Sequence, residues 1–88
     1  MTPPDTLLQF PCAFPVKVMG RVHPDLLPAV IELCRAVDAT FDEASVLQRP
    51  SANGTFVGLT LTIQATSREQ LDGLYRALSA HPRVAFVL

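Results

Sequence analysis

Hydrophobic and polar residues alternate over residues 55–64, the longest regular pattern in the chain. Aliphatic residues occupy every second position from Val57 to Ile63, and the positions between them hold Gly58 and two threonines. Period-two alternation in a run rich in β-branched residues predicts a β-strand with one buried face. We expect this strand near the middle of a sheet, with its threonine-rich side open to solvent or to a partner.

Three shorter stretches show the same alternation and are expected to complete the sheet: residues 14–21, 41–49 and 83–88. The second of these is the least apolar, which is typical of an edge strand. A turn over residues 50–54, with a proline and an Asn-Gly pair, predicts a hairpin between the second strand and the long one. In the last strand, we expect Val84, Phe86 and Leu88 to share one side.

Two other segments carry apolar residues at spacings of three and four, which predicts amphipathic helices. The first opens at His23-Pro24-Asp25 and ends within residues 37–40. Pro28 fits this helix only if its regular hydrogen bonds begin late, because proline has no N–H to donate. The second helix begins after Ser67, with Gln70 three residues further on, which is the spacing of a capping box.

The order β-α-β-β-α-β predicts an α+β, ferredoxin-like sandwich in a single domain, residues 1–88, with an N-terminal arm over residues 1–12. Right-handed crossovers place both helices on one face of a four-stranded antiparallel sheet. The first and third strands are central in this topology, and here they are the two most apolar strands. The open face is then expected to carry Lys17, Met19, Arg21, Phe56, Gly58, Thr60 and Thr62.

Composition narrows the range of functions. The chain has 88 residues, 49% hydrophobic and 17% charged, which suits one globular domain too small to enclose an active site beside its core. Its net charge of −1 and scattered basic residues predict no nucleic-acid or membrane partner. Without a visible signal peptide we expect a cytoplasmic protein. There Cys12 and Cys34 should stay reduced, and their spacing does not match a metal or redox site.

Residues able to support catalysis do not form a recognisable pattern. An enzyme would need an activated nucleophile, an acid–base pair or a metal cluster. The two histidines, His23 and His81, stand beside prolines at the expected helix ends, where capping accounts for them. Ser67 is accounted for by its position at a helix start. We therefore expect no enzymatic activity, no catalytic residue, no metal and no cofactor.

The turn between the first strand and the first helix is a candidate site for a small ligand. Gly20 permits close approach, the helix N-terminus favours an anion, and Arg21 has the geometry to pair with a carboxylate. Asp25 competes for the same groups, so an ordinary turn remains the alternative. The candidate ligand-binding residues are Met19, Gly20, Arg21, His23 and Asp25.

The open sheet face is the second candidate. Its mixture of apolar, small and polar residues suits contact with a protein, including a second copy in a homodimer. RNA-recognition domains of this topology stack bases on several central aromatics, and here only Phe56 is available, so RNA binding is least favoured. A merely solvated face remains the alternative. The candidate interface residues are Lys17, Met19, Phe56, Gly58, Thr60 and Thr62.

Five segments spread along the chain together resemble the YbeD-like family of small bacterial proteins: Leu7-Leu-Gln-Phe-Pro11, Lys17-Val-Met-Gly20, Pro50-Ser51 with Gly54, Thr62-Ile-Gln-Ala-Thr66 and Val87-Leu88. The resemblance implies a ferredoxin-like fold similar to the regulatory ACT domain, and a suggested role in regulating lipoate metabolism. ACT domains often bind a small ligand after their first strand, at an interface between two domains. Asn53 and Phe56 stand where the family is expected to carry lysine and tyrosine, which weakens an anion-binding role for the turn over residues 50–54.

Two hypotheses follow from these observations. The first is a non-enzymatic regulatory domain that senses a small anionic metabolite at the turn around Gly20, or that modulates a partner enzyme. The alternative is a ligand-free adaptor that binds another protein through the open sheet face or through the edge strand near Val46.

Overall fold

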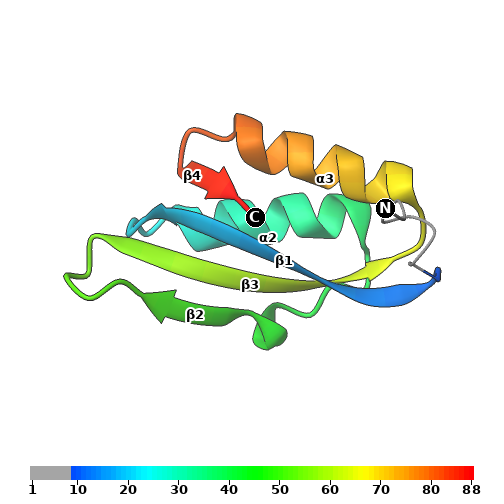
Figure 1. Cartoon of the computed structure of the whole chain (residues 1–88), viewed down its shortest axis with the longest axis horizontal. Helices are drawn as coiled ribbons and strands as arrows, with labels where there is room; N and C mark the ends of the chain where they lie inside the picture. Colours follow the sequence, from blue (N-terminus) through cyan, green and yellow to red (C-terminus); the bar gives the residue numbers. More distant parts are fainter. Residues whose placement is uncertain (1–8) are drawn as a thin grey trace, which may run out of the picture.

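Strand β3 (Phe56–Ala65) runs through the middle of the sheet, as its alternation predicts. In the computed structural model, which describes residues 9–88, the sheet has four antiparallel strands in the order β2-β3-β1-β4 (Figure 1). Most of the predicted N-terminal arm lies outside the described residues, and its last residue already belongs to a strand. The other strands are β1 (Cys12–Arg21), β2 (Leu47–Pro50) and β4 (Val84–Val87).

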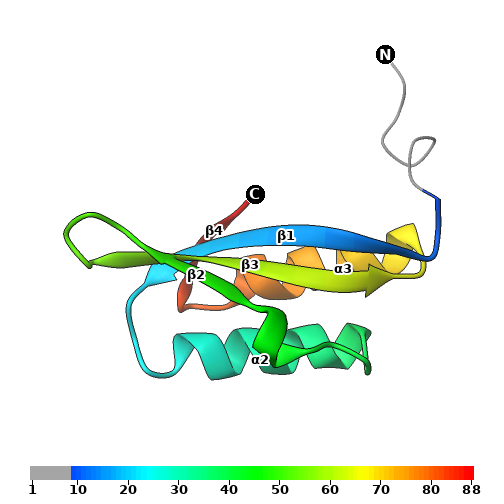
Figure 2. The same ribbon diagram turned by 90° about the horizontal axis from the view of Figure 1, so that it is seen from below.

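Two helices, α2 (Leu26–Val37) and α3 (Arg68–Ala80), cover one side of the sheet and leave the other side open (Figure 2). Apolar side chains of the sheet and both helices meet between the layers, where Val16, Leu61 and Leu74 are fully buried. Burial of such aliphatic surface is the main force that holds the layers together. The predicted ferredoxin-like α+β sandwich, with both helices on one face, is confirmed.

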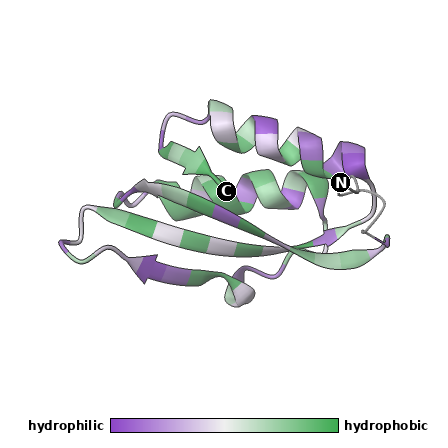
Figure 3. Ribbon diagram, viewed as in Figure 1, coloured by the Kyte–Doolittle hydropathy of each residue, from purple (hydrophilic) through white to green (hydrophobic). Residues whose placement is uncertain are grey.

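The hydropathy of successive residues varies along each strand and helix, as expected for elements with one buried side and one exposed side (Figure 3). Polar and apolar positions alternate along β3, where Leu59 and Leu61 are buried, Thr60 is half-buried and Thr62 is exposed. Successive side chains of a strand point to opposite faces, so the threonines lie on the open side. None of the helices formed by residues 9–88 is long and apolar enough to serve as a membrane span.

Helix α2 begins at Leu26 with Asp25 as its N-cap residue, at the end of the predicted opening segment. The N–H of Ala29 donates to the carbonyl of Asp25 at 3.2 Å. Pro28 therefore lies in the first turn, where its missing N–H costs no helical hydrogen bond. The expected late start of the hydrogen-bond pattern is confirmed, and the helix ends at Val37, within the predicted range.

Helix α3 starts with the residues predicted to cap it. The Oγ of Ser67 accepts the N–H of Gln70 at 3.1 Å. The Oε1 of Gln70 accepts the N–H of Thr66 at 2.6 Å, one residue before the N–H that a capping box uses. The Nε2 of Gln70 donates to the carbonyls of Val37 at 2.8 Å and Gln64 at 3.1 Å. One glutamine therefore joins the end of α2, the end of β3 and the start of α3.

The second strand is shorter than predicted. A 3-10 helix at Glu43–Ser45 lies in the first half of the predicted range, residues 41–49, and the strand starts only at Leu47. The carboxylate of Asp42 accepts the N–H of Ala44 at 2.9 Å, and its backbone carbonyl accepts the hydroxyl of Ser45 at 2.6 Å. Such local hydrogen bonds of Asp and Ser compete with strand formation, and a hydropathy pattern does not reveal them. The first half of the predicted strand is therefore wrong, whereas the edge position of the second half is confirmed.

Strand β4 contains a bulge that changes which of its side chains face the core. Met19 pairs with Phe86 whereas Gly20 pairs with Val84, so an extra residue of β4 stands between the two pairs. Val84 is buried and Val87 packs against the core, but Phe86 is 49% exposed. The expectation that Val84 and Phe86 share one side is wrong, because the bulge reverses the alternation. Phe86 therefore lies on the open face beside Met19.

Candidate functional site

The structure separates the candidate ligand-binding residues of the β1–α2 turn onto different surfaces. Arg21 extends over the open face, where its guanidinium carbon lies 5.4 Å from the centre of the Phe56 ring. Met19 lies on that same face, and the intervening Gly20 is buried on the helix side. A cation above an aromatic ring is a favourable contact. Arg21 is therefore directed away from the start of α2, where it was expected to meet a carboxylate.

Close packing accounts for Gly20 without a ligand. A Cβ at this position would lie 2.7 Å from the backbone oxygen of Arg83 and 3.0 Å from both methyl carbons of Leu26. A side chain would therefore push β1 away from the connection between α3 and β4, and from the first residue of α2. The glycine serves the close approach of two backbone segments.

Protein groups already surround the start of α2. The carboxylate of Asp25 lies 3.8 Å from a guanidinium nitrogen of Arg83 and 3.7 Å from the Nδ1 of His23. In the first turn, Leu26 and Ala29 donate their N–H groups to backbone carbonyls. A bound anion there would have to lie beside the carboxylate of Asp25, which repels it. The turn therefore offers little to an anionic ligand.

Strand pairing arranges the open face in rows, and two of them form a continuous surface. In the first row, Lys17 of β1 lies opposite Thr60 of β3, which lies opposite Leu47 of β2. The N–H of Leu88 donates to the carbonyl of Lys17 at 2.8 Å, which brings Leu88 to the end of this row. Leu47 and Leu88 are 67% and 70% exposed.

The second row crosses all four strands. Met19 lies between Phe86 of β4 and Gly58 of β3, and Gly58 lies opposite Arg49 of β2. Of the predicted interface residues, Thr62 lies further along β3, opposite Pro15. The open face therefore gathers the predicted residues of the central strands and adds residues from both edge strands.

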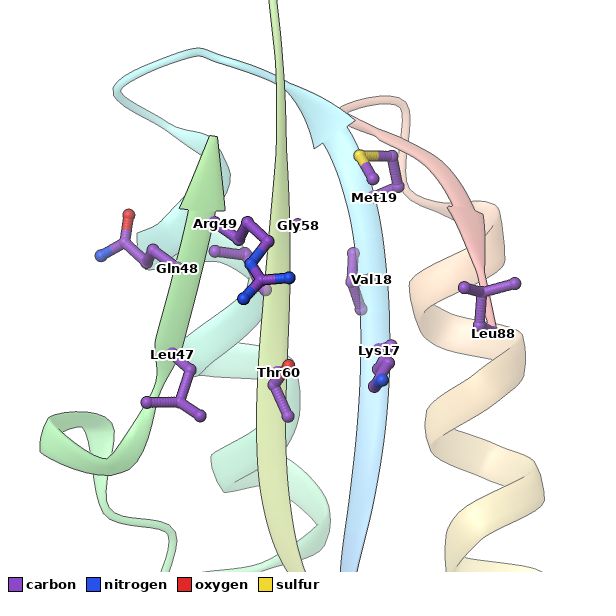
Figure 4. Close-up of a pocket in the computed structure, with 10 residues that line it drawn as sticks. Lys17, Val18, Met19, Leu47, Gln48, Arg49, Gly58, Thr60 and Leu88 are labelled. Atoms are coloured by element: carbon purple, nitrogen blue, oxygen red, sulfur yellow. The ribbon is translucent and has the colours of Figure 1, made fainter. Parts of the chain in front are cut away.

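A shallow hollow of about 510 Å³ lies between these rows on the open face (Figure 4). We call it the Gly58 hollow. In Figure 4 the side chain of Arg49 reaches from β2 across β3 near Gly58, and Lys17 stands on β1. The hollow is lined on the open face by Lys17, Met19, Leu47, Arg49, Gly58, Thr60 and Leu88.

The sequence-based list of interface residues lacks the members of this face that come from the two edges of the sheet, namely Leu47, Arg49, Phe86 and Leu88. The predicted hairpin contained a signal for the first two, because the length of its turn sets which residues of β2 lie opposite Gly58 and Thr60. The position of Phe86 depends on the bulge in β4, for which the sequence pattern carries no signal.

Charge divides between the two layers. The four strands carry Lys17, Arg21 and Arg49 and no carboxylate side chain. All seven acidic residues within residues 9–88 lie in the helices and in the segments that connect the elements, together with four arginines. The sheet layer is therefore positive and the rest of the described chain is negative, although the whole chain has a net charge of only −1.

The two histidines accept hydrogen bonds from the backbone, and Cys34 is part of the core. The Nδ1 of His23 accepts the N–H of Asp25 at 3.0 Å, and the Nδ1 of His81 accepts the N–H of Arg83 at 3.1 Å. Cys34 is fully buried in the core. Burial, and secondarily the nearby Asp38 carboxylate, raises the pKa of the Cys34 thiol to about 12. Cys34 therefore stays a neutral thiol.

Fold and surface together define a small α+β domain with an open, positively charged sheet face. The chain belongs to the family described as protein of unknown function (DUF493), whose model matches residues 5–88. The YbeD-like identity predicted from the sequence is confirmed by this membership.

Curated relatives match the chain over nearly its full length. A UPF0250 protein of Bordetella parapertussis is 51% identical over 86 residues, which cover 98% of this chain and 94% of the relative. A UPF0250 protein of Janthinobacterium sp. is 48% identical over 88 residues, which cover 100% of this chain and 97% of the relative. A UPF0250 protein of Leptothrix cholodnii is 52% identical over 83 residues, which cover 94% of this chain and 91% of the relative.

Proposed function

We propose that this protein is a non-enzymatic binding domain that docks a partner protein on its open sheet face. The observation that carries the proposal is one continuous surface that combines exposed apolar side chains with cations, on four strands that carry no acidic side chain. Leu47, Phe86 and Leu88 supply large exposed apolar groups, which are typical of interaction sites when they lie close together. Docking there would allow the domain to modulate a partner enzyme, the regulatory role that the family resemblance implies.

Other occupants fit this face less well. Two copies stacked face to face would bring Lys17, Arg21 and Arg49 of each copy toward those of the other, and like charges oppose association. A nucleic acid would stack its bases on aromatic side chains, and this face carries only two within residues 9–88. Phe56 already lies beneath Arg21, which leaves Phe86 as the one exposed ring without such a contact. Sensing of a small anion at the β1–α2 turn is the weaker hypothesis, because Asp25 lies where the anion would bind.

Site-specific photo-crosslinking tests the proposal in a bacterium that encodes a UPF0250 relative. A photoreactive phenylalanine analogue replaces Thr60 on the open face or, as a control, Arg76 on α3. We expect a discrete crosslinked protein from position 60 only, which disappears when Leu47→Asp and Phe86→Asp are added. Equal crosslinking from both positions contradicts docking on the open face, and a product of twice the chain's mass identifies a second copy instead.

A further inference from the structure

Gly58 has no packing reason to be a glycine. A Cβ at this position would lie 3.6 Å from the Cε of Met19 and 3.7 Å from the backbone oxygen of Arg49, which are ordinary van der Waals contacts. Positive backbone φ does not require it either, because within residues 9–88 only Gly54 has a positive φ. Glycine in a strand interior weakens the strand and often marks the close approach of another group. Gly58 therefore leaves open a space that a side chain would fill.

Donor groups of matching chemistry stand around that space. Arg49 and Lys17 come from the two strands that flank β3, and Thr60 lies on β3 between those strands (Figure 4). Within residues 9–88, neither Arg49 nor Lys17 forms an ion pair with a carboxylate. Guanidinium and ammonium groups next to a hydroxyl are a set of donors suited to a carboxylate.

Apolar groups border the same hollow. Met19, Leu47 and Leu88 line it, and Phe86 lies next to Met19 in the adjacent strand. A small anion alone would leave these apolar groups in water, whereas a peptide with both acidic and apolar side chains would cover them. The charge and the apolar surface therefore call for an occupant that carries both kinds of group.

We infer that the Gly58 hollow binds an acidic side chain of a partner protein, within a short segment whose neighbouring apolar residues cover Met19, Leu47 and Leu88. This inference rests on the proposed docking function and specifies the chemistry of the docked segment. The carboxylate lies between Arg49 and Lys17 and approaches the backbone at Gly58. Complementary charge then selects the partner and speeds its association.

Selection from a phage-displayed library of random dodecapeptides tests the inference. The purified protein is the target, and the best peptides are synthesised with a fluorescent label for anisotropy measurements at low and physiological salt. We expect enriched peptides to combine Asp or Glu with large apolar residues. Gly58→Val, Lys17→Ala and Arg49→Ala should each raise the Kd by about tenfold, the size of a hot-spot substitution. Arg76→Ala, at an exposed position of α3 away from the open face, should leave the Kd unchanged.

Circular dichroism and urea unfolding establish that each variant is folded before its binding is compared. If the enriched peptides are neutral or basic and Leu47→Asp or Phe86→Asp abolishes their binding, the acidic occupant is overturned. Docking on this face is then still supported. No selected peptide, or peptides insensitive to every open-face variant, would overturn both proposals. A labelled oligouridylate that binds and displaces the peptides would overturn the inference and identify a nucleic acid as the occupant.

Discussion

The carboxylate of Asp38 accepts a hydrogen bond from the backbone N–H of Gln64 at 2.9 Å, where β3 has no neighbouring strand on that side. Strand β2 reaches only as far as Thr60 along β3. Beyond that point the N–H of Gln64 is bound by Asp38, and its carbonyl is bound by the side chain of Gln70. Two side chains therefore replace the missing strand partner and tie the edge of the sheet to both helices.

Substitution of Asp38 should destabilise the domain. Asp38 is 7% exposed and also accepts the N–H and hydroxyl of Thr40, at 3.0 Å and 2.6 Å. Asp38→Ala leaves the N–H of Gln64 without its partner, and we expect a loss of about 1–3 kcal/mol in the free energy of unfolding. Urea unfolding of the variant measures this loss, with the exposed Glu32→Ala as control. Equal stability of the two variants would contradict the role of Asp38.

The same carboxylate should make stability depend on pH in the acid range. Burial alone would raise the pKa of Asp38, but hydrogen bonds from Thr40 and from the Gln64 N–H hold it below its usual value. A lowered pKa in the folded state stabilises the protein above the unfolded-state pKa of about 3.9, and this contribution is lost as pH falls through the folded-state pKa. We expect the stability difference between wild type and Asp38→Asn to shrink below about pH 4. Urea midpoints across this range measure it, and a difference that is constant with pH would count against the argument.

Cys34 and Cys12 should differ sharply in reactivity. Cys34 is fully buried with a pKa raised to about 12, whereas Cys12 is half-buried at the start of β1. The thiolate is the reactive form, so Cys34 should be modified only when the protein unfolds. Labelling with a chromogenic disulfide reagent should modify one thiol in the native protein and two in denaturant, and Cys12→Ser should abolish the native reaction. Rapid native labelling of Cys12→Ser would show that the core around Cys34 opens readily.

The sequence pattern predicted those features that depend on neighbouring residues along the chain. The alternation in β3 indicated its face and central position, and the Ser67–Gln70 spacing indicated the start of α3. Of the features it missed, the 3-10 helix at Glu43–Ser45 depends on local hydrogen bonds of Asp42, and the bulge in β4 depends on contacts between distant segments. The bulge that turns Phe86 toward the open face lies where Gly20 approaches the backbone of Arg83. Residues around the Gly58 hollow were therefore only partly predictable, because two of its walls come from edge strands.

Two glycines with opposite surroundings test how closely β1 packs. Gly20→Ala would bring a Cβ within 2.7 Å of the Arg83 oxygen, and we expect a loss of about 1–3 kcal/mol from overpacking. Gly73 lies within α3, and a Cβ there would meet no atom within 4 Å apart from its chain neighbours and the backbone of its own helix. Gly73→Ala should instead stabilise the protein by about 0.5–1 kcal/mol, because alanine favours helix. Urea unfolding of both variants provides the comparison, and a Gly20→Ala protein as stable as wild type would show that this approach is loose.

Adjacent residues of β3 provide the most direct test of which face is open. Leu61 is fully buried beneath the helices, whereas Thr62 is exposed on the other side of the same strand. Leu61→Asp buries an unpaired charge and should cost more than about 4 kcal/mol, enough to unfold a marginally stable domain. Thr62→Asp should cost less than about 1 kcal/mol, the range of strand propensities. Far-UV circular dichroism and urea unfolding distinguish the two variants. A folded Leu61→Asp protein together with an unfolded Thr62→Asp protein would reverse the assignment of the faces. The helices would then cover the residues that are assigned to the docking surface.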